Sequence, residues 1–309
     1  MSFVAGFGIA NVDFLFGHMP RVPRPGEEIY AKSFSRQLGG GPVATMIQLA
    51  RLNVPVRLAT YVGSGDQSAF VREQLALNRV PFVNMHGSRE AEPLAVSCII
   101  SCPEDRALVS YKPPAEAFHV AEDTVHQFYR GAKVAYVPLE HAYLCKRLRA
   151  EGAVIVMDSF WDDGLCMDWY EDVLPYVDYF TPNEKEAMKI TGAASAEEAL
   201  ERLSNHLPLA MVKLSEKGCL LRRNGVTMHI PGVEVDYVDA TGAGDAFLAG
   251  LLYGIFYGNS PEDCVRLGNI TGASAVTRIG CLSAEMNRAQ LRAQMERVYG
   301  VRLPDGNES

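Results

Sequence analysis

A glycine-rich stretch late in the chain, Asp239-Ala-Thr-Gly-Ala-Gly-Asp-Ala-Phe247, constrains the fold more than any other part of the sequence. Residues 233–238 before it alternate in polarity as a strand does, and residues 246–256 after it are apolar and small, as in a packed helix. The sequence therefore predicts a strand-to-helix junction. Gly242 and Gly244 would let the backbone come close to a ligand there, while the helix end presents unpaired N–H groups. Such a junction binds anions, phosphates in particular.

The acid in the first turn of this predicted helix, Asp245, allows two interpretations. An acid at a helix N-terminus commonly complements the helix dipole or caps the helix. A carboxylate beside a phosphate site would repel its ligand, unless it accepts the proton of a hydroxyl group that attacks the phosphate. The spacing of the motif alone leaves both interpretations open.

The motif DATGAGDAF resembles the signature of the ribokinase-like, or PfkB-type, carbohydrate kinases. The resemblance implies that Asp245 is the catalytic base and that the amides of Gly242, Ala243 and Gly244 form an anion hole for the transferred phosphoryl group. It also implies a ribokinase-like three-layer α/β/α domain with a mostly parallel central sheet and a small β-strand lid over the substrate. Residues 1–12, 38–93 and 112–309 would form the large domain, and residues 13–37 and 94–111 the lid.

Patterns elsewhere in the chain agree with such a sheet. Strand-like and helix-like segments alternate through residues 134–137, 141–151, 154–157, 169–174 and 177–181, as in a parallel sheet. Off this core, residues 21–38 read as one or two strands, and residues 94–100 and 107–111 as a pair joined at residues 101–105. Asn224-Gly225 between two apolar runs predicts a tight hairpin.

By the same resemblance, two segments are candidates for substrate binding, one polar and one rich in glycine. Asn11 and Asp13 follow the first strand, and an amide with a carboxylate suits a polyol because together they donate and accept hydrogen bonds. Gly40 and Gly41 open a helix in a loop that the family uses to contact the sugar. The family has an asparagine where this chain has Ala44, so ribose or fructose specificity is not carried over.

Two acids follow neighbouring strands of the predicted sheet. Functional residues in open α/β sheets gather at the carboxyl ends of the strands. Glu140 matches a substrate-contacting glutamate of ribokinase, and Asp158 follows the next strand. Each could instead cap a helix. On the lid side, cations that could meet an anionic substrate are Arg21, Arg24, Lys32, Arg36 and Lys112.

The residues expected to bind ATP and its metal ion come from segments later in the chain. Asn183 and Glu186 carry the family's N-x-x-E pattern and would act on nucleotide-bound Mg²⁺ through water, or form a capping box, or both. By resemblance, ATP would also contact Lys213, Ser215 and Gly218, with Asn269 near the adenine, alongside Gly242 and Gly244. A K⁺ ion would be held mainly by carbonyl groups at Asp239, Thr241, Ala275, Arg278 and Gly280.

Composition removes several other classes. The net charge of −8 argues against nucleic acid as the main partner, and no run approaches a membrane span. Seven dispersed cysteines without a CxxC pair suggest reduced thiols and a cytoplasmic protein. The chain has no GxxxxGK[ST] loop, and GFGIAN is one residue short of a dinucleotide fingerprint. Lid strands with exposed edges make a homodimer through the lid a reasonable expectation.

These features together predict an ATP-dependent kinase of a small sugar or sugar derivative, using Mg²⁺ and with K⁺ as a further expected cation. A nucleoside kinase of the same fold is the first alternative, and a non-catalytic protein that binds a sugar or nucleotide is the second. The sequence leaves the substrate, its charge and the phosphorylated hydroxyl group open.

Overall fold

The centre of the structure is a parallel sheet of six strands in the order β10-β9-β8-β1-β4-β5. Every neighbouring pair in it is parallel. The computed structural model describes residues 2–87, 92–102, 106–114 and 118–304. The mostly parallel α/β fold expected from the sequence is confirmed. The six strands are β1 (Val4–Phe7), β4 (Val56–Thr60), β5 (Phe82–Asn84), β8 (Val134–Tyr136), β9 (Val154–Met157) and β10 (Tyr179–Phe180).

Helices cover both faces of this sheet, because successive strand residues point to opposite sides. In β1, Val4 packs into one apolar core and Ala5 into the other. The Val4 side holds α1 (Gly41–Arg51), α2 (Asp66–Leu77), α7 (Ala243–Phe256), α8 (Pro261–Ala275) and α9 (Arg288–Tyr299). The Ala5 side holds α3 (Glu122–Tyr129), α4 (Cys145–Ala150), α5 (Glu184–Thr191) and α6 (Ala196–Leu203).

An antiparallel sheet of three strands continues the molecule beyond β10. It consists of β11 (Leu209–Lys213), β12 (Cys219–Arg223) and β13 (Val226–Ile230). A parallel bridge between Asn183 and Lys213 joins β11 to the end of the central sheet. Asn224 and Gly225 connect β12 to β13 with φ angles of 52° and 77°, so the hairpin predicted from these two residues is confirmed.

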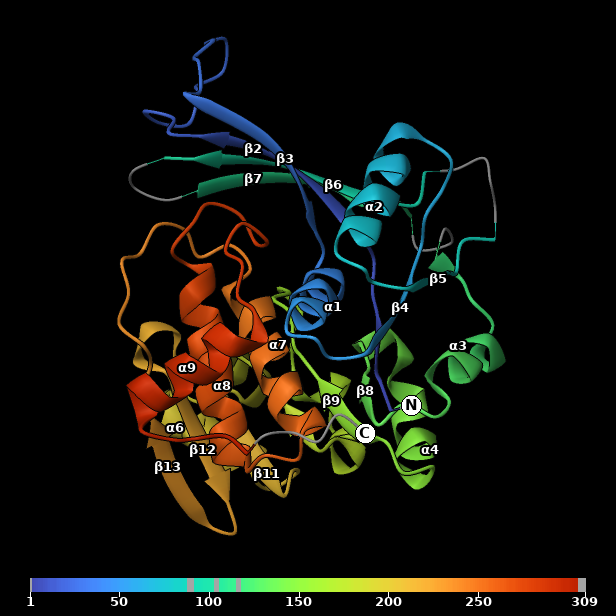
Figure 1. Cartoon of the computed structure of the whole chain (residues 1–309), viewed down its shortest axis with the longest axis vertical. Coiled ribbons are helices and arrows are strands. Elements are labelled where there is room, and N and C mark those ends of the chain that lie inside the picture. Colours follow the sequence, from blue (N-terminus) through green and yellow to red (C-terminus); the bar gives the residue numbers. More distant parts are fainter. Residues whose placement is uncertain (1, 88–91, 103–105, 115–117, 305–309) are drawn as a thin grey trace.

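A second layer of four strands lies above the body of the molecule in Figure 1, in the order β3-β2-β6-β7. The strands are β2 (Asn11–Gly17), β3 (Ser33–Gly39), β6 (Ala95–Ser101) and β7 (Arg106–Tyr111). The β2–β6 pair is parallel and the other two pairs are antiparallel. The predicted lid is therefore present, although part of the predicted 101–105 connection lies outside the described residues. The exact division into domains stays a prediction.

The lid sheet has two chemically different faces. Asp13, Ser97 and Ser110 are register partners and form a row on one side, which we call the polar face. Residues one position along each strand point the other way. That apolar face includes Phe14, Phe34 and Val109 and is partly exposed, with Phe34 at 60% and Val109 at 73%. The polar face carries the predicted substrate residues.

Helices α7 and α8 lie side by side in Figure 1, and their glycines pack tightly against the facing helix. A Cβ added to Gly250 would lie 2.4 Å from the carbonyl oxygen of Leu267, and one added to Gly254 would lie 2.9 Å from the Cα of Cys264. From the other helix, a Cβ on Gly268 would lie 2.9 Å from Phe247. The small residues therefore permit a backbone contact that fixes the position of α7.

Two local expectations are wrong. Residues 233–238 alternate in polarity but form no strand, because they have no neighbouring strand with which to pair: Tyr237 is 69% exposed, and the N–H groups of Val238 and Asp239 both donate to the carbonyl oxygen of Val276. Residues 169–174 form turns between two short 3₁₀ helices, η3 (Met167–Trp169) and η4 (Leu174–Tyr176), in place of a helix. The glycine motif consequently follows an irregular segment. All seven cysteines are free thiols, as the sequence suggested.

Candidate functional site

The N-terminus of α7 is built from glycine. Gly242 precedes the helix with φ at 77°, and a Cβ there would lie 2.3 Å from the Cβ of Cys281, so only glycine fits this position. A Cβ on Gly244 would have a single neighbour within 4 Å, the Lys213 Nζ at 3.7 Å. In the first turn of the helix, the N–H of Ala243 donates to the carbonyl oxygen of Ala240 at 3.2 Å, and the Gly244 side faces open space.

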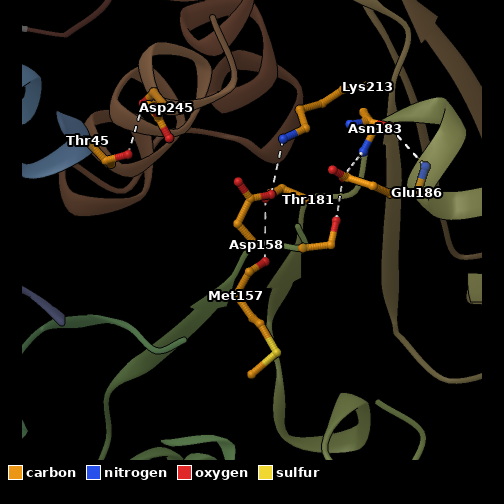
Figure 2. Close-up of polar contacts among 9 residues, drawn as sticks. Thr45, Met157, Asp158, Thr181, Asn183, Glu186, Lys213 and Asp245 are labelled. Carbon is orange, nitrogen blue, oxygen red and sulfur yellow. Dashed lines mark hydrogen bonds and ion pairs between the residues drawn. The ribbon is translucent and has the colours of Figure 1, made fainter. Parts of the chain in front are cut away.

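Asp245 lies where the N-termini of α7 and α1 meet. Its carboxylate Oδ1 is 3.2 Å from the place a Cβ on Gly41 would take, at the start of α1. The Thr45 hydroxyl of α1 donates to the carbonyl oxygen of Asp245 at 3.2 Å, which ties the two helices together (Figure 2). The structure therefore brings the glycine loop that opens α1 to the acid of the central motif.

The charge state of Asp245 is shaped by its surroundings. Burial raises the pKa of the Asp245 carboxyl to about 7, and the negative charges of Asp158 and Asp13 act in the same direction while Lys213 acts against them. A carboxyl group with a pKa near neutrality can exchange a proton with a bound hydroxyl group. Asp245 is therefore a candidate general base, and that role stays a prediction.

Asp158 and Lys213 form an ion pair across from Asp245. The Lys213 Nζ donates to the Asp158 Oδ1 at 3.1 Å, and the Thr181 hydroxyl donates to the same oxygen at 2.6 Å (Figure 2). Burial works to lower the pKa of Lys213, but Asp158, Glu186 and Asp245 outweigh it and the pKa rises. Burial also raises the pKa of Asp158, which Lys213 partly offsets. Lys213 is therefore a shielded cation beside the first turn of α7.

The N-x-x-E pair makes the capping box that the sequence allowed. The Asn183 Oδ1 accepts from the N–H of Glu186 at 3.0 Å, and the Glu186 Oε2 accepts from the N–H of Asn183 at 3.0 Å. The Ser159 hydroxyl donates to the same Glu186 oxygen at 2.6 Å. One carboxylate oxygen is thus committed to protein donors. The side-chain oxygens of Asn183 and Glu186 are suitable for holding Mg²⁺ through bridging water molecules, and that role stays a prediction.

The lid contributes a polar network on its polar face. The Asn11 amide donates to the Asp13 Oδ1 at 2.7 Å and to the Ser97 hydroxyl at 2.9 Å, and Ser97 pairs with Ser110 at 2.9 Å. The Asn11 Oδ1 is buried and has no hydrogen-bond partner within the protein. A buried acceptor of this kind matches a ligand that offers a hydroxyl donor.

The loop that enters α1 packs directly under this network. A Cβ on Gly39 would lie in contact with the Asp13 carboxylate, and Gly40 has φ at 94° with its Cα facing the backbone of residues 9–11. Gly40 and Gly41 therefore connect the Asp13 region to Asp245. The sequence named both segments as candidate substrate contacts, and that role stays a prediction.

The structure gives less support to the other residues that the sequence named as possible substrate contacts. Glu140 is exposed and lies in the first turn of the 3₁₀ helix η2 (Leu139–Leu144), shortly after β8. The buried Tyr136 at the end of β8 has its pKa raised by burial and by the charges of Asp158, Asp245 and Glu140. Among the lid cations, Arg21 pairs with Glu27 at 2.5 Å and Arg36 lies over the Phe70 ring at 4.0 Å. These two arginines therefore already have partners in the protein.

The predicted nucleotide residues occupy a compact turn. Ser215 begins the 3₁₀ helix η5 (Ser215–Lys217) and Gly218 ends it with φ at 95°; a Cβ on Gly218 would lie 2.2 Å from the carbonyl oxygen of Ile230. The Asn269 amide donates to the carbonyl oxygens of Ile230 and Pro231 at 3.3 and 3.0 Å. Asn269 therefore holds the strand end beside this turn, and its contact with adenine stays a prediction.

The loop proposed for a monovalent ion is organised by Asp239. One carboxylate oxygen accepts from the N–H and hydroxyl of Thr241, at 3.1 and 2.9 Å, and the other accepts from the N–H of Gly280 at 2.8 Å. Ala275 ends α8 and the Arg278 side chain is exposed. The residues named from the sequence thus lie in one loop cluster, while ion binding itself stays a prediction.

Hydroxyl contacts that escaped the sequence analysis include Thr45 to Asp245, Ser159 to Glu186, and Thr181 to Asp158. Each joins residues that are distant in the sequence, and a hydroxyl group carries no spacing signal. Within the described ranges, no cluster of three or more His, Cys, Asp or Glu side chains could hold a metal ion. In the same part of the chain, no helix has the length and apolar character of a membrane span.

Comparison with known proteins gives a consistent result. Residues 1–287 match the group described as pfkB family carbohydrate kinase. Ribokinase of Haemophilus influenzae is 24% identical over 303 residues, covering 92% of this chain and 95% of that protein. Ribokinase of Thermotoga maritima has a TM-score of 0.79 at 22% identity, covering 96% of this chain and all of that one. Ribokinase of Arabidopsis thaliana, solved with ribose and ATP, has a TM-score of 0.76 at 21% identity, covering 94% and 98%.

Proposed function

This chain belongs to the pfkB family of carbohydrate kinases, and on that basis we propose that it transfers the terminal phosphoryl group of ATP to a hydroxyl group of a small sugar or sugar derivative. Enzymes of this family are phosphotransferases with an alcohol group as acceptor. The observation that carries the proposal is the meeting of two helix N-termini at one carboxylate, where Asp245 of α7 lies against Gly41 of α1. Among the described residues outside α7 itself, only the Lys213 Nζ comes within 4 Å of a Cβ placed on Gly244.

In the proposed reaction, the sugar hydroxyl oxygen attacks the γ-phosphorus of ATP. Asp245 accepts the hydroxyl proton, a new bond forms between the sugar oxygen and phosphorus, and the bond to the bridging oxygen of ADP breaks. The amides of Gly242, Ala243 and Gly244 donate to the oxygens of the moving phosphoryl group, where charge is highest in the transition state. The raised pKa of Asp245 supports its part as the base.

Lid and body would hold the substrate between them. Asn11 and Asp13 hydrogen-bond the sugar from the polar face of the lid, and Gly40 and Gly41 approach it from below. The buried Oδ1 of Asn11 supports this assignment because a sugar hydroxyl would complete its bonding. Glu140 lies at the rim and contacts the more distant end of the substrate.

Mg²⁺ and K⁺ belong to the proposal as well. Asn183 and Glu186 would hold Mg²⁺ through water, and when bound the ion would neutralise charge on the nucleotide phosphates. K⁺ would be held mainly by the carbonyl groups of Asp239, Thr241, Ala275, Arg278 and Gly280. ATP would occupy the side formed by Lys213, Ser215, Gly218 and Asn269.

The apolar face of the lid supports a homodimer. Phe34, Val109 and Tyr111 are 60%, 73% and 62% exposed on one side of a sheet whose other side is polar. Exposed apolar patches of this kind on a sheet are commonly covered by a partner. A second copy would cover this face and leave the polar face to the substrate.

A coupled ADP-release assay tests the proposed function. Purified protein with ATP and Mg²⁺ is given pentoses, hexoses, sugar acids, sugar phosphates and nucleosides, and the product is analysed for a new phosphate ester. Turnover of a sugar or sugar derivative is the expected result. A clear preference for nucleosides would favour a nucleoside kinase, and binding of ATP and a sugar without turnover would favour a non-catalytic protein.

A further inference from the structure

The buried pair of Asp158 and Lys213 has no assigned role beyond the contact of Lys213 with ATP expected from the family resemblance. The two residues are 55 positions apart in the sequence and meet at 3.1 Å, with side chains 15% and 12% exposed. An ion pair shielded from water in this way is more fixed in geometry than an exposed pair. Its remaining donors and acceptors must also find hydrogen-bond partners. Thr181 supplies a further donor to Asp158 at 2.6 Å.

The location of the lysine is electrostatically unusual. Its Nζ lies 3.7 Å from the Cβ position of Gly244, in the first turn of α7, and 5.9 Å from the centre of the Phe247 ring of the same helix. The N-terminus of a helix carries a partial positive charge and repels a cation. Neighbouring carboxylates offset this repulsion, and among them Asp158 accepts a hydrogen bond from the Lys213 Nζ at 3.1 Å, while Glu186 and Asp245 act on its charge as well.

We propose that Asp158 is a positioning residue that holds Lys213 beside the α7 N-terminus, ready to contact the phosphoryl group as it is transferred. This inference rests on the proposed kinase function. A phosphate at the glycine amides would lie within reach of the Lys213 ammonium, whose three donors can serve Asp158 and a phosphate oxygen together. The pair thereby supplies a cation to the transition state without leaving an unpaired charge when the site is empty.

Both members of the pair also act on the base. The charged groups around Asp245 are Asp13 on β2, Asp158 after β9 and Lys213 on β11, with Tyr136 on β8 and Cys281 before α9 as further titratable neighbours. Asp158 raises the pKa of Asp245 and Lys213 lowers it. Removal of one partner should therefore move this pKa in the direction opposite to removal of the other.

The test compares steady-state kinetics of Asp158→Asn, Lys213→Met and Lys213→Arg with the wild type across pH. Asp158→Asn should lower kcat about 10- to 100-fold, as a misplaced catalytic cation does, while KM for the sugar stays near the wild-type value. The acid limb of kcat/KM should move to lower pH in Asp158→Asn and to higher pH in Lys213→Met. Lys213→Arg should recover part of the kcat lost in Lys213→Met because it restores a cation.

The control is Arg149→Met, which breaks the Arg149–Asp178 pair at the opposite end of the β9–β10 strands. It should leave kcat and the pH profile unchanged. If Asp158→Asn does not fold, the double variant Asp158→Asn/Lys213→Met, which removes both charges, replaces it and should show an acid limb close to that of the wild type. Wild-type kcat in Asp158→Asn, or limbs that do not move in opposite directions, would overturn this inference. Absence of any wild-type kinase activity would overturn the proposed function instead.

Discussion

Helices α5 and α7 begin in opposite ways, although each has an acid in its first turn. The N-terminus of α5 is closed by its own side chains, since Asn183 and Glu186 bond each other's backbone N–H groups at 3.0 Å. The N-terminus of α7 begins at Gly242, which has no side chain to cap it, and its acid is turned toward a neighbouring helix at Gly41. An acid in the first turn of a helix is therefore ambiguous by itself. The N-cap residue that precedes the helix decides whether the acid belongs to a capped end or to a candidate reactive site. A side chain before the helix seals it, whereas glycine leaves its donors to a ligand.

The largest effect is expected from Asp245→Asn. Loss of the base should lower kcat by about 10²- to 10⁴-fold, measured by ADP release at saturating substrate. The change should also stabilise the fold at alkaline pH. The pKa of Asp245 is about 7 in the folded chain and 3.8 as its ordinary value, so the folded state binds this proton more tightly and the wild type loses stability as pH rises between those values.

Chemical denaturation of Asp245→Asn should therefore show added stability on the order of 2–4 kcal/mol at pH 8, and little difference at pH 4. The matched control is Asp66→Asn, which alters the exposed first-turn acid of α2 and should change neither activity nor this pH dependence. An active Asp245→Asn protein would remove the distinction between α7 and a helix that is merely capped.

The second effect separates two glycines of the motif. Gly242→Ala meets Cys281 at 2.3 Å and requires a left-handed backbone, so it should destabilise the fold by about 1–3 kcal/mol as well as reduce activity. Gly244→Ala meets only the end of Lys213 and should keep or slightly raise the Tm, since alanine favours a helix by up to about 1 kcal/mol. Its kcat should nevertheless fall, because the methyl group occupies the space that the phosphoryl group needs. Full activity in Gly244→Ala would show that no ligand approaches this turn.

The smallest effect is expected at α5. Asn183→Ala removes the cap and should cost about 1 kcal/mol of unfolding free energy in a denaturant titration. Asn183→Asp keeps an acceptor for the N–H of Glu186 and should restore that stability. If Asn183→Asp also restores wild-type activity at every Mg²⁺ concentration, the closed end of α5 is structural alone. A persistent need for more Mg²⁺ would give it a share in the metal site.

The sequence predicted the sheet, the lid strands and the glycine end of α7 because each is encoded locally. Alternation with turn residues marked the hairpin at Asn224-Gly225, and the glycines of the motif correspond to a positive φ at Gly242. The strand predicted at residues 233–238 failed for lack of a partner strand, which a local pattern does not reveal.

The pairing within the site was beyond the sequence for the same reason. Lys213 and Asp158 meet only because β11 follows β10 in space, through the bridge between Lys213 and Asn183. Thr45 is an ordinary helix residue until α1 is laid against α7. The sequence placed Asn269 near the adenine, which stays a prediction, but it did not indicate that the Asn269 amide donates to two main-chain carbonyl oxygens. Side chains of this kind acquire their contacts from packing, which no spacing rule describes.

The close fit of α7 against α8 limits how such a chain can change over time. Gly250, Gly254 and Gly268 leave no room for one further carbon atom, so almost any replacement would displace α7 and carry Asp245 out of line. The apolar face of the lid is open by comparison, with Phe34 60% and Val109 73% exposed. Replacements are therefore expected to accumulate on the exposed lid face while the contact between α7 and α8 is held still, and under the proposed function such a chain keeps its phosphoryl-transfer site while its lid changes.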